Sequence, residues 1–187
     1  MTTAKAYKTL EHCKLTDSKA KILYPYIDKK SDPWFVTYGG MHTGIDVEGY
    51  EIYAYCSGVV LAIGNDKEYN MVSVQYDKNV ILRYGNLKTV SVSVGEIIYT
   101  PTLIGYADRY LHFEYASTKK EDSVWVVRIG AKTYYKHNPE LILDGTVYTD
   151  GAKTKVVQYD IDPDMEIMYE YVDNRMPPGY MRLGDVE

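Results

Sequence analysis

The chain has 187 residues with 45% hydrophobic and 25% charged residues, which is long enough for one core and ordinary for a globular domain. Its net charge of -5 comes entirely from residues 145–187, which hold nine acidic and four basic residues. No basic stripe is present, which argues against nucleic-acid binding, and no apolar run is long enough to span a membrane.

Strand signals recur at intervals of about ten residues along the chain. They occupy residues 52–63, 71–76, 80–84, 89–94, 111–115 and 124–129. The stretch 89–94 (TVSVSV) alternates strictly between polar and apolar residues, as a half-buried strand does. Helical signals are few, and residues 16–23 predict one short helix. The sequence therefore predicts an all-β fold, mainly an antiparallel β sandwich or open barrel, with few short helices.

The composition also divides the chain into three segments. We expect residues 1–39 to be an N-terminal segment that packs on the core, residues 40–144 to be the main β domain, and residues 145–187 to be an acidic extension. The extension is expected to be an arm or a small β appendage, with a partly ordered tail as the alternative. The N-terminus lacks the apolar stretch of a signal peptide.

Several residue types carry weaker signals. The chain has 21 Tyr against 2 Phe and 2 Trp, which suits half-buried strands or an interface within an assembly. Cys13 and Cys56 are expected to be buried, reduced thiols, since no pattern supports a disulfide. His12 and His137 are expected at the surface.

Three short segments carry the candidate site residues. Residues 42–46 read HTGID, residues 84–87 read YGNL and residues 110–114 read YLHFE. Together they resemble the lysostaphin-type zinc endopeptidases, which cut peptide cross-links in bacterial cell walls and carry H-x-x-x-D, Y-x-H-L and H-L-H-F-E. The resemblance runs over residues 40–143 and implies that residues 40–144 form a peptidase-like β domain.

The resemblance implies a zinc site made by His42, Asp46 and His112. Zinc accepts imidazole nitrogen and carboxylate oxygen, and a catalytic site leaves the fourth position to water. Taken alone, a His and an Asp four residues apart would be an ordinary structural pair. The zinc prediction therefore depends on the three segments occurring together in the order of the family.

The two positions that match the family's catalytic histidines hold Asn86 and Tyr110. An amide cannot take up and return a proton near neutral pH, and tyrosine, with a pKa near 10, is a poor base. A tyrosine hydroxyl could still donate a hydrogen bond to an oxyanion. Glu114 matches a residue that holds a ligand histidine in the family, and Glu114 or Asp108 could in principle replace the lost base.

These observations predict a structural, catalytically inactive component of a phage particle, at the tail tip or baseplate, which retains the zinc residues. The virion location follows from the habits of the family and the absent export signal, and the expected partners are other phage structural proteins. One alternative is an active zinc endopeptidase that cleaves peptidoglycan cross-links during phage entry. Another is a cell-wall binding module that holds peptidoglycan without cutting it.

Overall fold

The structure is a computed structural model that describes residues 15–16, 22–24, 26, 42–66, 68–120, 125–143 and 168–172. Within these ranges the chain consists of β-strands and their connections, apart from one turn of 3-10 helix, η1 (Pro139–Leu141). All strand pairs are antiparallel except one. The prediction of a mainly antiparallel all-β fold is therefore confirmed.

The strands form one sheet with the path β11-β9-β10-β8-β6-β5-β4-β7, and β1, β2 and β3 lie off this path. In chain order they are β1 (Ile22–Tyr24), β2 (Ile45–Glu48), β3 (Glu51–Tyr53), β4 (Gly58–Asp66), β5 (Tyr69–Asp77), β6 (Val80–Val90), β7 (Ile97–Ile98), β8 (Leu103–Ser117), β9 (Trp125–Ile129), β10 (Lys132–His137) and β11 (Met168–Val172).

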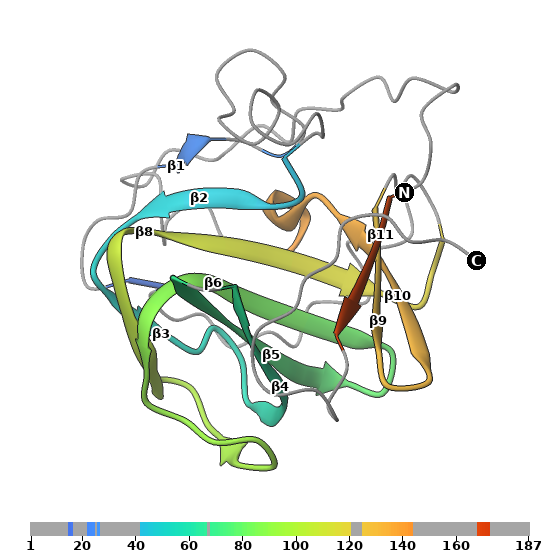
Figure 1. Cartoon of the computed structure of the whole chain (residues 1–187), viewed down its shortest axis with the longest axis horizontal. Helices are drawn as coiled ribbons and strands as arrows, with labels where there is room; N and C mark the ends of the chain where they lie inside the picture. The colour runs from blue at the N-terminus through green and yellow to red at the C-terminus, as the bar shows by residue number, and fades with distance from the viewer. Residues whose placement is uncertain are drawn as a thin grey trace.

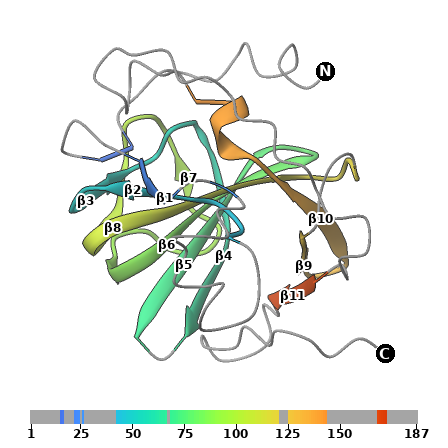
Figure 2. The same cartoon turned by 90° about the horizontal axis from the view of Figure 1, so that it is seen from above.

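Strand β8 is the spine of the sheet, because it is the longest strand and pairs with four others. Strand β6 runs along one side of β8, while β3, β2 and β10 pair with successive stretches of β8. Figure 1 shows β2, β8, β6 and β5 side by side. In Figure 2 the β9–β10 hairpin and β11 lie to one side of these strands.

The alternation of side chains along β8 divides them between two faces. Phe113 and Tyr115 lie in the main apolar core, whereas Ala116 belongs to a smaller cluster that also contains Val127 and Tyr134 of the β9–β10 hairpin. His112 and Glu114 alternate with Phe113 and Tyr115, so they share the face of the smaller cluster. This face carries the candidate site, and the hairpin covers one end of it.

Three local predictions differ from the structure. The predicted strand 52–63 is interrupted at residues 54–57, because β3 pairs with β8 whereas β4 pairs with β5 and β7. The predicted strand 89–94 ends at Val90, after which the chain turns, with Gly95 at a φ of 85°. The predicted helix 16–23 is wrong at both described ends: Thr16 bridges to Ile52, and β1 pairs with β2.

The outer segments of the chain both contribute to the described fold. From the N-terminal segment, Leu15 and Tyr26 are buried in the main core. From the C-terminal extension, β11 pairs in parallel with β9 along its whole length. The three-segment division itself stays a prediction. Cys56 is buried, and Cys13 and His12 lie outside the described residues. None of the described helices has the length and apolar character needed to cross a membrane.

Candidate metal centre

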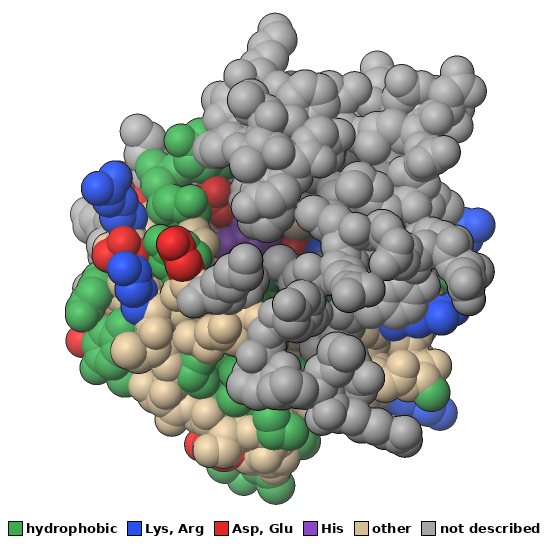
Figure 3. All heavy atoms as spheres, in the orientation of Figure 1, with side chains coloured by type: hydrophobic (Ala, Val, Ile, Leu, Met, Phe, Trp, Pro, Cys, Tyr) green, Lys and Arg blue, Asp and Glu red, His purple; other side chains and the backbone are tan. Residues whose placement is uncertain are grey.

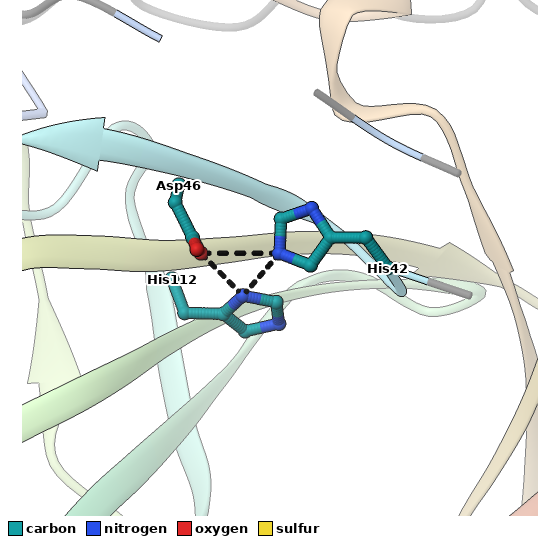
Figure 4. A group of neighbouring side chains, drawn as sticks. All are labelled: His42, Asp46 and His112. Atoms are coloured by element: carbon teal, nitrogen blue, oxygen red, sulfur yellow. Dashed lines mark hydrogen bonds and ion pairs between the residues drawn. The ribbon is translucent and has the colours of Figure 1, made fainter. Parts of the chain in front are cut away.

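Pairing between β2, β8 and β6 builds the site. Asp46 of β2 lies opposite His112 of β8, and Gly85 of β6 lies opposite His112 on its other side. His42 precedes β2 and turns its ring toward the same point (Figure 4). The structure thus brings together the three residues that the sequence analysis assigned to zinc, and all three are buried.

Three donor atoms converge at this point. His42 Nε2 is 3.1 Å from Asp46 Oδ1 and 3.2 Å from His112 Nδ1, and His112 Nδ1 is 2.8 Å from Asp46 Oδ1. Ligand atoms bound to zinc at its usual bond lengths in a tetrahedron are separated by about 3.3 Å. The observed separations differ from this value by a few tenths of an ångström. Donor types and spacing therefore both fit a zinc ion.

The other nitrogen of the His112 ring is held by Glu114. His112 Nε2 lies 3.1 Å from Glu114 Oε1, and the Thr43 hydroxyl donates a hydrogen bond to the same oxygen. A carboxylate that accepts from one ring nitrogen leaves the other available as a metal ligand. Close packing supports this arrangement, since a Cβ on Gly44 would meet the carbonyl oxygen of Phe113 at 2.3 Å. Glu114 therefore lies where a residue that orients a ligand histidine belongs.

Two buried cations hold Glu114 in turn. Arg83 Nη1 lies 2.6 Å from Glu114 Oε2, and Lys136 Nζ lies 2.9 Å from Glu114 Oε1. Ser73 adds a contact of 3.2 Å from its Oγ to Arg83 Nε. The sequence analysis missed Arg83 and Lys136. One signal could have identified Arg83: it stands inside the apolar run 80–84 (VILRY), which a sheet would bury.

These contacts shift several pKa values. Burial opposes ionisation of Asp46, but hydrogen bonds from His112 and His42 lower its pKa below the usual value. Burial likewise opposes ionisation of Glu114, but Lys136 and Arg83 hold its pKa well below the usual range. Burial lowers the pKa of His112, yet the contacts to Asp46 and Glu114 outweigh this effect and raise it to about 9. A metal ion on Nδ1 would compete with that proton.

Asn86 and Tyr110 lie beside the three donor residues. Tyr110 is two residues before His112 on β8 and therefore shares its face, and the Asn86 side chain lies near enough to its hydroxyl to lower its pKa. Burial raises the pKa of Tyr110, and the Asn86 side chain offsets this only in part. The Tyr24 ring packs edge-on against Tyr110, with 6.4 Å between the ring centroids. The phenol therefore keeps its proton at neutral pH.

A backbone irregularity places Asn86 at this site. The pairing of β6 with β8 shifts register between Gly85 and Leu87, and Asn86 has a φ of 61°. From one pair to the next, β6 advances two residues, from Gly85 to Leu87, while β8 advances five, from His112 to Ala107, so the extra residues lie on β8. Asparagine tolerates the left-handed conformation better than most residues. Leu87 returns to the buried core. The left-handed backbone of Asn86 thus lies where the pairing of β6 with β8 is interrupted, next to the pair of Gly85 with His112.

The other candidate residues from the sequence lie elsewhere. Asp108 is exposed and pairs with Lys88, with 3.5 Å between Lys88 Nζ and Asp108 Oδ2. His137, which was expected at the surface, is instead buried, because β10 pairs with β8, and its Nε2 lies 3.0 Å from Ser117 Oγ.

In the space-filling view, histidine atoms are visible in a small area bordered by acidic atoms (Figure 3).

Solved structures of other proteins resemble parts of this chain. A crystal structure of CbpA from L. salivarius REN shares 31% identity over 40% of this chain and 56% of its own, with a TM-score of 0.37. Lysostaphin shares 22% identity over 58% of this chain and 49% of its own, with a TM-score of 0.45. The chain thus spans about half the length of both proteins.

A structure of the SpoIIQ–SpoIIIAH pore-forming complex aligns over 77% of this chain and 95% of its own, with 16% identity and a TM-score of 0.51, which indicates a shared fold. No curated protein sequence matches the chain. Residues 40–124 match peptidase family M23, and the three donor residues and Glu114 all lie within that range. Residues 40–124 therefore form a lysostaphin-type domain of peptidase family M23.

Proposed function

We propose that this chain is a zinc-holding, catalytically inactive M23 domain that serves as a structural component of a phage particle, at the tail tip or baseplate. The observation that carries the proposed inactivity is that Asn86 and Tyr110 occupy the positions beside the donor residues, next to Gly85 on β6 and two residues before His112 on β8. Neither side chain exchanges a proton readily near neutral pH. Peptide hydrolysis needs such exchange to activate water and to protonate the leaving amine.

The zinc part of the proposal depends on the donor set. His42, Asp46 and His112 would hold the ion through Nε2, Oδ1 and Nδ1, the three atoms that converge in the structure. When bound, zinc supplies Lewis-acid polarisation and lowers the pKa of a coordinated water. Three protein ligands leave one position open, so the site retains the ligand count of a catalytic centre.

Neither nearby carboxylate suits the role of replacement base. Glu114 is buried, its pKa is held far down by Lys136 and Arg83, and its oxygens already accept from those cations, from Thr43 and from His112. A carboxylate with a low pKa is a weak base. Asp108 is paired with Lys88 at the surface. The geometry therefore supports metal binding better than proton transfer.

The second candidate function is slow zinc endopeptidase activity on peptidoglycan, and one observation favours it. The Tyr110 phenol retains its proton and lies on the same strand face as His112, so it could donate a hydrogen bond to an oxyanion formed at the site. This function would still lack a group that activates water. A cell-wall binding role without cleavage uses the same surface and predicts saturable binding of wall fragments without product.

Two measurements test the proposal. Metal analysis of protein purified without chelators should give about one zinc per chain, and His42→Ala should lose it. Purified peptidoglycan of several cross-link types, incubated with the natural chain, should release no new amino groups above the level seen with His42→Ala. Release by the natural chain but not by His42→Ala would establish the endopeptidase alternative instead.

The particle location and its partners stay predictions from the sequence. Mass spectrometry of purified phage particles, compared with the lysate from which they came, should find the chain enriched in the particles. A chain found only in the unassembled fraction would contradict this part of the proposal and leave the zinc and activity parts standing.

A further inference from the structure

The buried charges around Glu114 extend the metal centre beyond the residues that match the M23 family. Lys136 lies on β10, twelve residues past the end of the match at residue 124. Its side chain is 2% exposed, and its Nζ lies 2.9 Å from Glu114 Oε1. We propose that Lys136 is a positioning residue for the metal site, acting through Glu114 on His112. This inference rests on the zinc part of the proposed function.

The division of contacts between the two Glu114 oxygens gives Lys136 a distinct role. Oε2 is held by Arg83, whose Nη1 is 2.6 Å away. Oε1 is the atom that faces His112 Nε2, at 3.1 Å, and it also accepts from Lys136 and from Thr43. Lys136 therefore fixes the oxygen that decides which ring nitrogen of His112 carries the proton.

The state of His112 decides whether the site can take a metal. A ring that donates from Nε2 to Glu114 presents the lone pair of Nδ1 to Asp46 and His42. A Glu114 side chain that rotated away would leave the His112 ring free to turn or to move its proton to Nδ1. Partners that fix a ligand histidine in this way typically change metal affinity by about 10- to 100-fold.

Charge also favours a cation at this position on β10. At the site, the buried carboxylates Asp46 and Glu114 are matched by the buried cations Arg83 and Lys136, provided that His42 and His112 are neutral; the other buried carboxyl group among the described residues, Glu140, lies on η1. Neutral histidine is the state that binds metal. Removal of the Lys136 charge would leave a buried negative excess, and such an excess costs free energy unless a proton or another cation compensates it.

The hairpin that carries Lys136 is anchored independently of the metal site. Val127 of β9 and Tyr134 of β10 pack with Ile81 and Ala116 in the smaller apolar cluster. A loss of packing in this cluster can therefore be produced without touching Glu114. A substitution in this cluster can therefore serve as a control, because it weakens the packing of the hairpin and leaves the contact between Lys136 and Glu114 in place.

The test measures zinc affinity by competition with a chromophoric chelator, and the absorption spectrum of the cobalt-loaded protein, in the full chain. Lys136→Met keeps the length of the side chain and removes its charge, and we expect about a 10-fold loss of zinc affinity with an altered cobalt spectrum. Lys136→Arg should restore most of the affinity. Val127→Ala, which loosens the hairpin core, should bind zinc within about twofold of the natural chain.

The outcomes separate the inference from the proposed function. A natural chain that binds no zinc would overturn both. A natural chain that binds zinc, with equal affinity in Lys136→Met, would overturn the inference alone, as would an equal loss in Val127→Ala. If Lys136→Met does not fold, Lys136→Gln replaces it with the same expected loss. Nitrogen NMR of the His112 ring gives a second reading, and the variants with weakened affinity should show less of the form protonated at Nε2.

Discussion

His112 and Tyr110 project from the same face of β8, two residues apart, yet their surroundings differ. His112 is surrounded by Asp46, His42 and Glu114, with Glu114 fixed by two buried cations. Tyr110 is half-buried; the neutral side chains of Asn86 and Tyr24 lie beside it, and the charge of Asp46 adds to the rise of its pKa. The contrast indicates that a set of metal-donor side chains and a pair of groups placed for proton transfer depend on different neighbours in this fold.

The largest effect is expected when Asn86 and Tyr110 are both replaced by histidine. The double variant Asn86→His with Tyr110→His places imidazoles beside the donor residues, and we expect peptidoglycan hydrolysis to rise by roughly 10²- to 10⁴-fold, the usual contribution of general acid–base catalysis. Release of amino groups from purified peptidoglycan measures it. A double variant that binds zinc but stays inert would mean that something other than these two residues limits the chemistry.

Removal of the buried charge of Glu114 should lower the stability of the protein more than removal of an exposed charge. Glu114→Gln leaves Arg83 and Lys136 buried with a neutral neighbour, and breaking a buried ion pair in this way costs about 3–5 kcal/mol of stability. Urea unfolding of the full chain measures it. The matched control is Asp108→Asn, which breaks an exposed pair with Lys88 and should cost less than about 1 kcal/mol. Equal effects from the two substitutions would contradict the assignment of Glu114 as a buried anchor.

Substitutions at the two β8 residues sharpen the same comparison. His112→Ala removes one of three zinc donors and should weaken zinc binding by about 10²-fold or more, since a four-ligand site is worth about 10–16 kcal/mol in total. Tyr110→Phe removes only a hydroxyl and should leave zinc affinity unchanged. Chelator competition compares both with the natural chain. A large loss in Tyr110→Phe would show that the phenol is itself a ligand.

A smaller effect is expected at Glu140, whose pKa is raised, whereas the pKa values of Asp46 and Glu114 are lowered. Burial raises the pKa of Glu140, and the hydrogen bond from Asn138 offsets this only in part. The pKa of Glu140 is higher in the folded state than in the unfolded state. The protonated carboxyl group therefore contributes to the stability of the folded state at acid pH, and this contribution is lost as pH rises through the folded pKa and the buried group ionises. Glu140→Gln should therefore be slightly more stable than the natural chain at pH 7 and not at pH 4, as measured by thermal unfolding.

The sequence predicted the parts of this protein that repeat a local pattern. Alternation and turn residues located most strands, and the order of the three motifs led to His42, Asp46 and His112. Lys136 has no local signal and Arg83 only its place inside an apolar run, because a cation in a strand normally faces solvent. Only the pairing of β6 and β10 with β8 brings these two residues to Glu114. His137 was misplaced for the same reason, since its burial follows from long-range pairing.

The break in the predicted strand 52–63 has a similar cause. Its residues are uniformly suited to strands, so propensity alone could not show where the chain leaves β8 and joins β5. The end of β6 at Val90 coincides with its last pairing with β8, opposite Gly105. Beyond it, Ser91 N still donates a hydrogen bond to Ile104 O of β8, and Gly95 N donates to Val60 O of β4 instead.

The backbone conformation at Asn86 bears on how readily this position could be converted to histidine. Histidine, like asparagine, tolerates the left-handed conformation found there, so the backbone that presents Asn86 could present an imidazole without rebuilding the strand. In the standard genetic code, asparagine and tyrosine codons each become histidine codons through a single change of the first base. Under the proposed function, ordinary point mutation would therefore sample histidine at both positions, and selection for cell-wall cleavage could act on the result.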